Sequence, residues 1–218
     1  MERSESAKIL VKCFQDLYDQ REEGGDFAVV CGQQEIPVHS FVLSARSEVL
    51  GKSVTLDFKE KETGKIHLEF VTEKSVKAFV QFLYGVLELK KLDVESLLEL
   101  IQMGELYNVA GLSPAADSQL AQLISEENVF GILEISEANC YKHTHLKIHC
   151  LDFIAKNIQI ESLVKNNKLH QFPDLAVYLI ENGAACSSTS TGHRRATRED
   201  VKMCSVRLFD RWVLIFIY

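Results

Sequence analysis

Five consecutive apolar residues, Phe27 to Cys31, most restrict how this chain can fold. A strand with one face in water alternates apolar and polar side chains. This segment has no polar side chain, so we expect a strand that is buried on both faces. A turn sequence at 32–34 follows, and Ile36 and Val38 then alternate with less apolar neighbours. The pattern predicts a β-hairpin that the rest of the chain must cover.

Helical spacing of apolar residues occurs on both sides of this hairpin. A first helix is expected to end at Gly24-Gly25. Later helices are expected from His39, from the N-caps Thr72 and Asp93, and after Ser113-Pro114. The apolar positions expected to face the core of these later helices are Phe41, Val42, Ala45 and Val49, then Val76, Phe79, Val80 and Leu83, then Val94, Leu97, Leu98 and Ile101.

The helical pattern weakens between the helix expected from His39 and the helix expected from Thr72. Residues 51–65 are polar and begin with glycine, which predicts a loop or a frayed helix, and residues 66–68 are a candidate for a short strand. The order of helix, hairpin, helices, short strand and further helices predicts an α+β cluster, with helices packed on a small sheet.

The second half of the chain shows helical patterns alone. Ser125 is a candidate N-cap for a helix with Val129, Ile132 and Leu133 inward, and the last helix is expected to end at Asn182-Gly183. The remaining inward positions in this half are Leu146, Cys150, Phe153 and Ile154, then Leu175, Val177, Tyr178, Leu179 and Ile180. We therefore expect a domain over 7–122, a helical region over 123–182, a flexible linker over 183–200 and an apolar C-terminal tail of unknown role over 201–218.

Composition narrows the class of protein. The 218 residues are 46% hydrophobic and 25% charged, with a formal net charge of −7. These values are ordinary for a globular protein and argue against a nucleic-acid partner, which needs clustered positive charge. No apolar run approaches the roughly 20 residues that span a bilayer, and we expect no signal peptide. The scattered cysteines suggest reduced thiols, and hence a cytoplasmic or nuclear location.

Several stretches together resemble a known family. Asp26-Phe27, followed by PVHSFVLSARSEVL at 37–50, IHLEFVTEKSVKAFVQFLYG at 66–85 and LLELIQMGELYNVAGL at 97–112, resembles the core signature of the BTB/POZ domain. The helices from Ser125 onward resemble three-box and BACK-type extensions, and the order is similar to the BTB half of speckle-type POZ proteins. The resemblance implies an α+β BTB/POZ fold, a small sheet flanked by helices, followed by an all-α BACK-like extension.

The resemblance also implies a dimer. The first helix carries an apolar stripe for which a small core has no obvious room, and in BTB domains such a helix packs across a two-fold axis. A helix packed on its own domain is the alternative. Asp26 can equally cap a strand end, because the basic residue of the family's charged pocket is replaced here by Ser40. The expected dimer-interface residues are Ile9, Leu10, Cys13, Phe14, Leu17, Asp26 and His39.

A second implied partner is a cullin. Cullin-binding BTB domains carry a hydrophobic-x-Glu motif in the loop that Phe58-Lys59-Glu60 occupies here. An aromatic side chain can fill a pocket on a partner helix while the glutamate adds a directed charge. The alternative is a solvated loop, and the small or polar residues at 51–53 suggest a shallower groove. The expected cullin-binding residues are Leu56, Phe58, Lys59, Glu60 and Tyr107.

One cluster of cysteines and histidines contains residue types that can bind a metal ion. Cys140, His143, His145, His149 and Cys150 lie within eleven residues, but zinc sites usually show paired ligands on either side of a loop, and Cys150 falls on an apolar stripe. We expect core cysteines and surface histidines, with no metal and no cofactor. The spacing of the Ser, His and Asp residues suggests no catalytic set either. A metalloenzyme that uses the cysteine and histidine cluster is the weakest of the functional hypotheses.

The sequence thus predicts a non-enzymatic interaction protein. The leading hypothesis is a dimeric substrate adaptor for a cullin-based ubiquitin ligase, with itself or another BTB protein as the dimer partner, a cullin scaffold, and a client that the sequence does not identify. The alternative hypothesis is a BTB scaffold or transcriptional adaptor that dimerises without binding a cullin.

Overall fold

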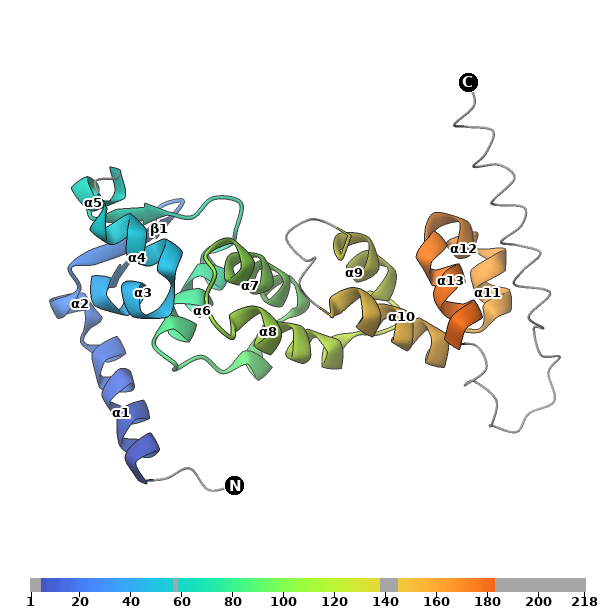
Figure 1. The fold of residues 1–218 in the computed structure, drawn as a ribbon, viewed down its shortest axis with the longest axis horizontal. Helices are drawn as coiled ribbons and strands as arrows, with labels where there is room; N and C mark the ends of the chain where they lie inside the picture. Colours follow the sequence, from blue (N-terminus) through green and yellow to red (C-terminus); the bar gives the residue numbers. More distant parts are fainter. Residues whose placement is uncertain (1–4, 57–58, 138–144, 183–218) are drawn as a thin grey trace. The chain divides into compact units, whose positions relative to one another are not determined.

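The computed structural model describes residues 5–56, 59–137 and 145–182 (Figure 1). They fall into two compact units: one within Met1–Leu123 and Ile135–Leu146, the other within Ile124–Glu134 and Lys147–Tyr218. The strands are β1 (Phe27–Cys31), β2 (Gln34–Val38) and β3 (Lys65–His67). The helices are α1 (Glu5–Asp19), α2 (Arg21–Gly24), α3 (Ser40–Arg46), α4 (Glu48–Thr55), α5 (Lys59–Thr63), α6 (Glu73–Leu83), α7 (Val94–Leu106), α8 (Leu112–Leu120), α9 (Val129–Ile135), α10 (Leu146–Asn157), α11 (Ile160–Lys165), α12 (Lys168–Gln171) and α13 (Pro173–Asn182), with 3₁₀ turns at Leu89–Lys91 and Ala121–Leu123.

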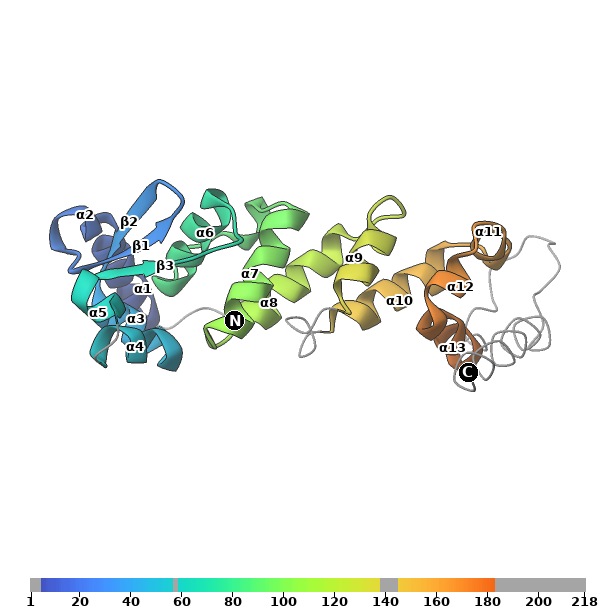
Figure 2. The same cartoon turned by 90° about the horizontal axis from the view of Figure 1, so that it is seen from above.

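The first unit is built on a three-stranded sheet in the order β2-β1-β3 (Figure 2). Strand β1 is antiparallel to β2, with Val29 opposite Ile36, and parallel to β3, with Val29 beside Ile66. All five residues of β1 are buried, which confirms the predicted buried hairpin. The expected short strand forms as well, one residue earlier than predicted. Because β1 has a strand on each edge, its backbone groups are paired on both sides.

Helices α6 and α7 complete the core of this unit. Both begin at the predicted N-caps: the Thr72 side chain accepts from the backbone N–H of Ser75, and the Asp93 side chain accepts from that of Ser96. The ion pair with Lys74 and the bonds from Ser96 hold the pKa of Asp93 well below its usual range. The predicted inward residues Val76, Phe79, Val80, Leu83, Leu97, Leu98 and Ile101 are all buried.

The helix expected from His39 is divided into two, and this corrects the predicted buried face. Ser47 is extended, ends α3 and begins α4, where its hydroxyl oxygen accepts from the backbone N–H of Leu50. The break changes the helical phase of α4, and within α3 the buried face carries Val42 and Leu43, so Phe41 lies off that face and is 56% exposed. Ala45 and Val49 are exposed too, and the buried positions are instead Val42, Leu43 and Leu50.

The segment at 51–65 also departs from the prediction of a loop or a frayed helix, since α4 extends to Thr55 and α5 follows within it. Gly51 permits the close packing of α4 on α3, because a Cβ there would lie 3.2 Å from Cα of Ser44. The glycine that seemed to weaken a helix is therefore required by the packing of two helices.

The second unit is helical throughout its described part. Val129, Ile132 and Leu133 of α9 are buried as predicted, and just before the helix the side chain of Asn128 accepts from the backbone N–H of Ser125, whose carbonyl accepts from the backbone N–H of Val129. Buried residues of α10 and α13 include Cys150, Ile154, Leu175 and Leu179, whereas Val177 is half exposed, contrary to the prediction. No helix among the described residues is long and apolar enough to cross a membrane.

Aromatic and polar contacts supplement the apolar packing of this unit. The rings of Phe130 and Phe172 stack at 5.9 Å, and the Lys168 ammonium lies over both. The Tyr178 hydroxyl donates to the Asp152 carboxylate, which raises the pKa of Tyr178 and, with Lys156, lowers that of Asp152. These contacts hold α9, α10, α12 and α13 to one another.

A buried polar contact fixes the start of α3 in the first unit. The Tyr84 hydroxyl accepts from the backbone N–H of His39 at 2.9 Å and lies 2.8 Å from Nδ1 of the same residue. Tyr84 is fully buried at the end of α6, and burial raises its pKa. One phenol thus links the residue that begins α3 to the C-terminal end of α6.

We expect Tyr84→Phe to lower the free energy of unfolding by about 1–3 kcal/mol, because the buried N–H of His39 would lose its acceptor. Urea denaturation measures the change. Tyr18→Phe is the control, since the Tyr18 hydroxyl makes no hydrogen bond within the described residues, and it should change stability little. An unaltered denaturation midpoint in Tyr84→Phe would show that this contact does not stabilise the fold.

Candidate interaction surfaces

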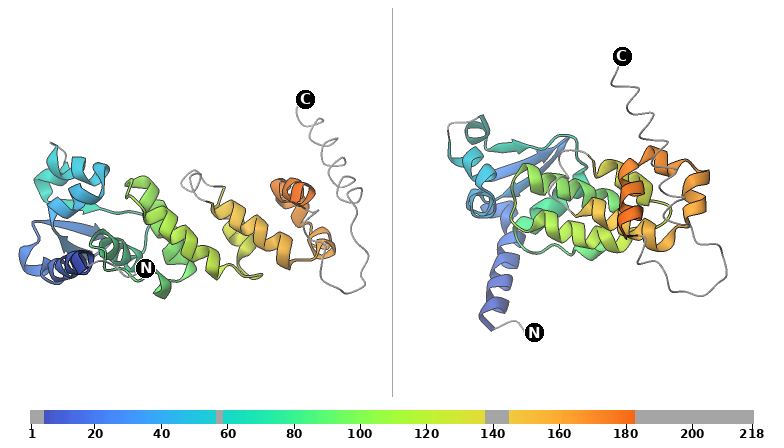
Figure 3. Two further views of the ribbon diagram at one scale, coloured as in Figure 1. Left: turned by 60° about the horizontal axis from the view of Figure 1, so that its bottom comes forward. Right: turned by 45° about the vertical axis from the view of Figure 1, so that its right-hand side comes forward.

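Helix α1 projects from the rest of the first unit (Figure 3). Its C-terminal end is attached through Tyr18, whose ring meets the edge of Tyr84 at a centroid distance of 5.5 Å. Of the predicted stripe, Ile9, Leu10 and Phe14 are 57, 61 and 41% exposed, Cys13 is exposed and Leu17 is half-buried. Most of the stripe is therefore left uncovered by the described part of the chain.

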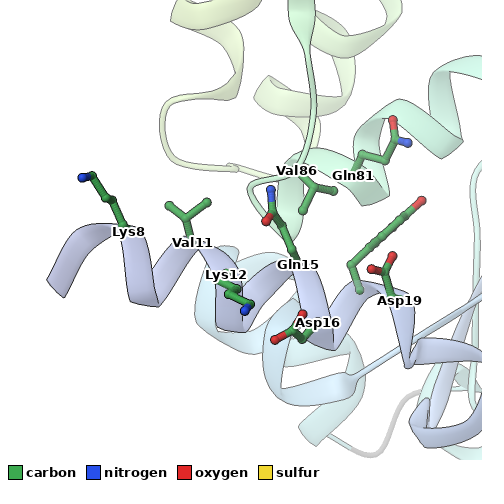
Figure 4. A pocket seen from close by; sticks show the side chains of 9 residues that line it. Lys8, Val11, Lys12, Gln15, Asp16, Asp19, Gln81 and Val86 are labelled. Carbon is green, nitrogen blue, oxygen red and sulfur yellow. The ribbon is translucent and has the colours of Figure 1, made fainter. Parts of the chain in front are cut away.

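The other side of α1 borders an open groove of about 610 Å³ (Figure 4). Gln15 of α1 and Val86, which follows α6, face each other across it. Its remaining lining is charged or partly buried: Lys8, Val11, Lys12, Asp16, Tyr18, Asp19 and Gln81. Because the polar side of α1 faces this groove, the apolar stripe points away from the chain's own core.

Asp26 caps α3 from outside that helix. Its carboxylate accepts from the backbone N–H of Ser40 at 2.7 Å and from the Ser40 hydroxyl at 2.6 Å. Burial alone would raise the pKa of Asp26, but the two bonds from Ser40 outweigh it and lower that pKa below its usual value. Asp26 thus caps a helix rather than its own strand, and Ser40 supplies neutral donors where the family carries a basic residue.

His39 occupies the core rather than the surface. It is 7% exposed and is held by Tyr84, so it agrees with the interpretation of a packing histidine. Buried in this way, its side chain offers a dimer partner almost no area. The exposed neighbour is Phe41, whose ring lies 5.5 Å from that of His39. Sequence reasoning missed Phe41 as a surface residue because its spacing matched a continuous buried face.

The predicted cullin-binding residues lie around α4 and α5. Leu56 is exposed at the end of α4, Lys59 and Glu60 begin α5, and Phe58 lies outside the described residues. Tyr107 follows α7, and its carbonyl accepts from the hydroxyl of Ser47 at the start of α4. The structure therefore places Tyr107 beside the start of α4, about 12 Å along that helix from Leu56.

The side chain of Tyr107 is half-buried. Its ring packs on Phe79 with 5.8 Å between centroids, and burial raises its pKa, with a smaller contribution from the nearby Glu69 carboxylate. Leu106, the residue before it, is exposed. Sequence reasoning did not select Leu106, although an apolar residue at the polar end of a helix is a signal that could have found it.

The histidine and cysteine cluster is described only in part. Cys140 and His143 lie outside the described residues, Cys150 is fully buried, and the backbone N–H of His145 donates to the Asp117 carboxylate at 2.9 Å. Among the residues the structure describes, no three potential ligands come together in a metal-binding group.

The small sheet, its covering helices and its exposed apolar groups define a protein-interaction module. A model of the BTB/POZ domain matches residues 14–123, just over half of the chain. The chain therefore belongs to the BTB/POZ domain family. The BTB part of the predicted α+β fold is confirmed, and helices follow that part, whereas their assignment as a BACK extension and the likeness to speckle-type POZ proteins stay predictions.

Individual relatives agree with this family. A BTB/POZ domain-containing protein of Arabidopsis thaliana is 29% identical over 60% of this chain and 39% of its own length. The human Kelch repeat and BTB domain-containing protein 3 is 28% identical over 62% of this chain and 21% of its own length. Of solved structures, the BTB domain of human gigaxonin matches 57% of this chain and 97% of its own, with 18% identity and a TM-score of 0.44. The chain thus spans well under half the length of these two curated relatives.

We expect the contribution of Asp26 to stability to depend on pH. Its folded pKa lies below the unfolded value of about 3.9, so the stabilisation is complete above that value and is lost as the pH falls through the folded pKa. Asp26→Asn should cost about 1 kcal/mol at pH 7, as for a lost helix cap, and less at pH 3, because part of the stabilisation is lost as the carboxylate becomes protonated. Urea denaturation at both pH values measures this. Asp19→Asn, at an exposed position of α1, should lack the dependence, and an equal cost of Asp26→Asn at both pH values would contradict the assignment.

Proposed function

We propose that this protein is a dimeric substrate adaptor for a cullin-based ubiquitin ligase. The observation that carries the proposal is the apolar stripe of α1, which stays exposed on a helix that projects from a BTB domain. A second set of residues, on α4, α5 and the end of α7, supports a separate contact with a cullin.

Dimerisation follows from the cost of leaving this stripe in water. Burying a large apolar side chain is worth about 1.5–3 kcal/mol, and Ile9, Leu10 and Phe14 stand together on α1, exposed among the residues that the structure describes. A two-fold axis lets the same stripe cover itself on a second copy or on another BTB protein. Asp26 supports such a seam indirectly, because it fixes the start of α3 and with it the exposed ring of Phe41.

The proposed cullin surface combines the hydrophobic-x-Glu motif with an aromatic residue, Tyr107, that is anchored to α4. Leu56 supplies an apolar group at the end of α4, Glu60 supplies a charge in the first turn of α5, and Phe58 lies between these two residues in the sequence. Tyr107 is anchored to the other end of α4 through Ser47. Anchored aromatic groups beside an exposed apolar residue are typical of interface hot spots.

The proposal extends to the layout of the chain. We propose a BTB domain over 7–122 and a three-box or BACK-like region over 123–182 that receives the client, with a cytoplasmic or nuclear location. The predicted linker and apolar tail, 183–218, lie outside the described residues. A BTB scaffold that dimerises without a cullin is the second candidate, and the neutral Ser40 partner of Asp26 favours it.

For the dimer, we expect the double variant Phe14→Asp, Leu17→Asp to sediment as a monomer at micromolar concentration, because two unpaired charges would enter the seam. Analytical ultracentrifugation of the wild type and the variant makes the comparison. Val177→Asp adds one charge at an exposed apolar position of α13 and should leave the wild-type state unchanged. A monomeric wild type would refute dimerisation through α1.

For the cullin, we expect Phe58→Ala to weaken binding by about tenfold or more, since it truncates an aromatic anchor. Glu60→Ala should cost less, because a charge at the rim is screened by water. Binding is measured by calorimetry against the N-terminal domain of each cullin in turn. Glu23→Ala on α2 is the matched control for charge. Binding of no cullin by the wild type would leave the scaffold candidate as the better description.

A further inference from the structure

One aromatic side chain of the first unit is almost completely exposed and has a strained backbone. Phe70, in the segment between β3 and α6, is 92% exposed and has a φ of 62°. The other described non-glycine residues with positive φ are both asparagines, Asn108 and Asn167, which tolerate that conformation. A bulky residue is strained in this region, so the rest of the fold must impose the conformation.

The neighbours of Phe70 show how the conformation is imposed. On one side, the backbone N–H of Leu68 donates to the carbonyl of Val30 at 2.8 Å. On the other, the thiol of Cys31 donates to the carbonyl of Val71 at 3.3 Å, and both the backbone N–H and the hydroxyl of Thr72 donate to Glu99 at 2.8 Å. The segment is thus fixed to β1 and α7 on either side of Phe70, which holds that ring out in a defined position.

Beside this ring lies an open hollow of about 920 Å³. Its apolar lining comes from the end of β1 and from the same segment, with Val30, Cys31, Leu68 and Val71. Burial raises the pKa of the Cys31 thiol, and Glu73 and Glu99 raise it further, so the thiol stays protonated and uncharged at neutral pH. The floor of the hollow therefore carries no charge of its own.

The rim of the hollow is acidic. Glu69 and Glu73 line it and are both exposed, and no ion pair joins either of them to another side chain in residues 5–56, 59–137 and 145–182. The lysine that also lines it, Lys74, is paired with Asp93 at 2.5 Å. An apolar hollow with uncompensated carboxylates at its edge and a fixed aromatic beside it complements a ligand that carries both apolar and positive groups.

We propose that this hollow is a docking site for a basic and apolar peptide segment of a partner protein, with Phe70 as its aromatic anchor. An apolar side chain of the segment enters between Val30 and Val71, and its Lys or Arg side chains meet Glu69 and Glu73. The fixed backbone on either side of Phe70 fits this role, because an anchor residue whose backbone is already ordered loses less conformational freedom on binding. The site uses neither the stripe of α1 nor the residues of the proposed cullin surface.

The test is a selection of random twelve-residue peptides, displayed on phage, against the immobilised full-length protein. We expect the enriched peptides to carry at least two Lys or Arg residues beside a large apolar residue. Synthetic copies, measured by fluorescence anisotropy, should bind Phe70→Gly about tenfold or more weakly than the wild type, as for loss of an aromatic anchor. The double variant Glu69→Gln, Glu73→Gln should weaken binding several-fold, and added salt should weaken binding to the wild type.

Matched variants distinguish binding at this site from nonspecific peptide binding and from loss of the folded structure. Val164→Ala removes another exposed apolar side chain, Glu23→Gln another exposed carboxylate, and both should bind the peptides as the wild type does. Phe70→Gly should melt no lower than the wild type, because glycine adopts a positive φ without strain. The proposal is wrong if no peptide is enriched, if the enriched peptides lack basic residues, or if Phe70→Gly binds them equally. It is also wrong if Phe70→Gly alters sedimentation of the protein alone, which would make a second copy the occupant.

Discussion

The central strand β1 is the element on which the rest of the first unit depends. Its side chains are buried on both faces, and its backbone must find partners on both edges because no water reaches it. The hairpin supplies one edge through β2, and β3 supplies the other only after α3, α4 and α5 have brought the chain back in the parallel direction. The helices that connect β2 to β3 are therefore needed so that both edges of the one buried strand are paired.

The start of α3 shows how this core positions the surfaces. Asp26, directly before β1, caps the helix through Ser40. The hydroxyl of Tyr84, at the end of α6, accepts from the backbone N–H of His39. Two polar contacts, one from a residue before α3 and one from a residue after it, thus orient this short helix. The same contacts carry Phe41 to the surface and connect the base of α1 to the core through Tyr18.

The first unit presents chemically different surfaces on one scaffold. The stripe of α1 is purely apolar and extended, which suits a symmetric contact with a like surface. The segment around Phe70 is small and concave, with an acidic rim, which suits a short ligand of opposite charge. An interaction protein that holds several partners together needs surfaces that do not compete, and these two differ in shape as well as in charge.

Local patterns predicted those features that local physics controls. The buried hairpin follows from an uninterrupted apolar run, and the starts of α6 and α7 follow from Thr72 and Asp93, because a cap acts on N–H groups within three residues of itself. The resemblance to BTB domains was likewise carried by residues within continuous stretches. The exposure of the α1 stripe was expected from its lack of room in a small core, and its role in a dimer stays a prediction.

Tertiary structure alone decided what depends on residues far apart in the chain. The break at Ser47, which separates α3 from α4, is fixed by a hydroxyl that donates to the carbonyl of Tyr107, sixty positions away. The positive φ of Phe70 is imposed by Val30, Cys31 and Glu99, none of which is its sequence neighbour. By itself the sequence determined the buried hairpin and the N-caps of α6 and α7, since those depend on near neighbours. Which apolar side chains reach the surface was decided only by packing, because helix phase and backbone strain are set by contacts between distant segments.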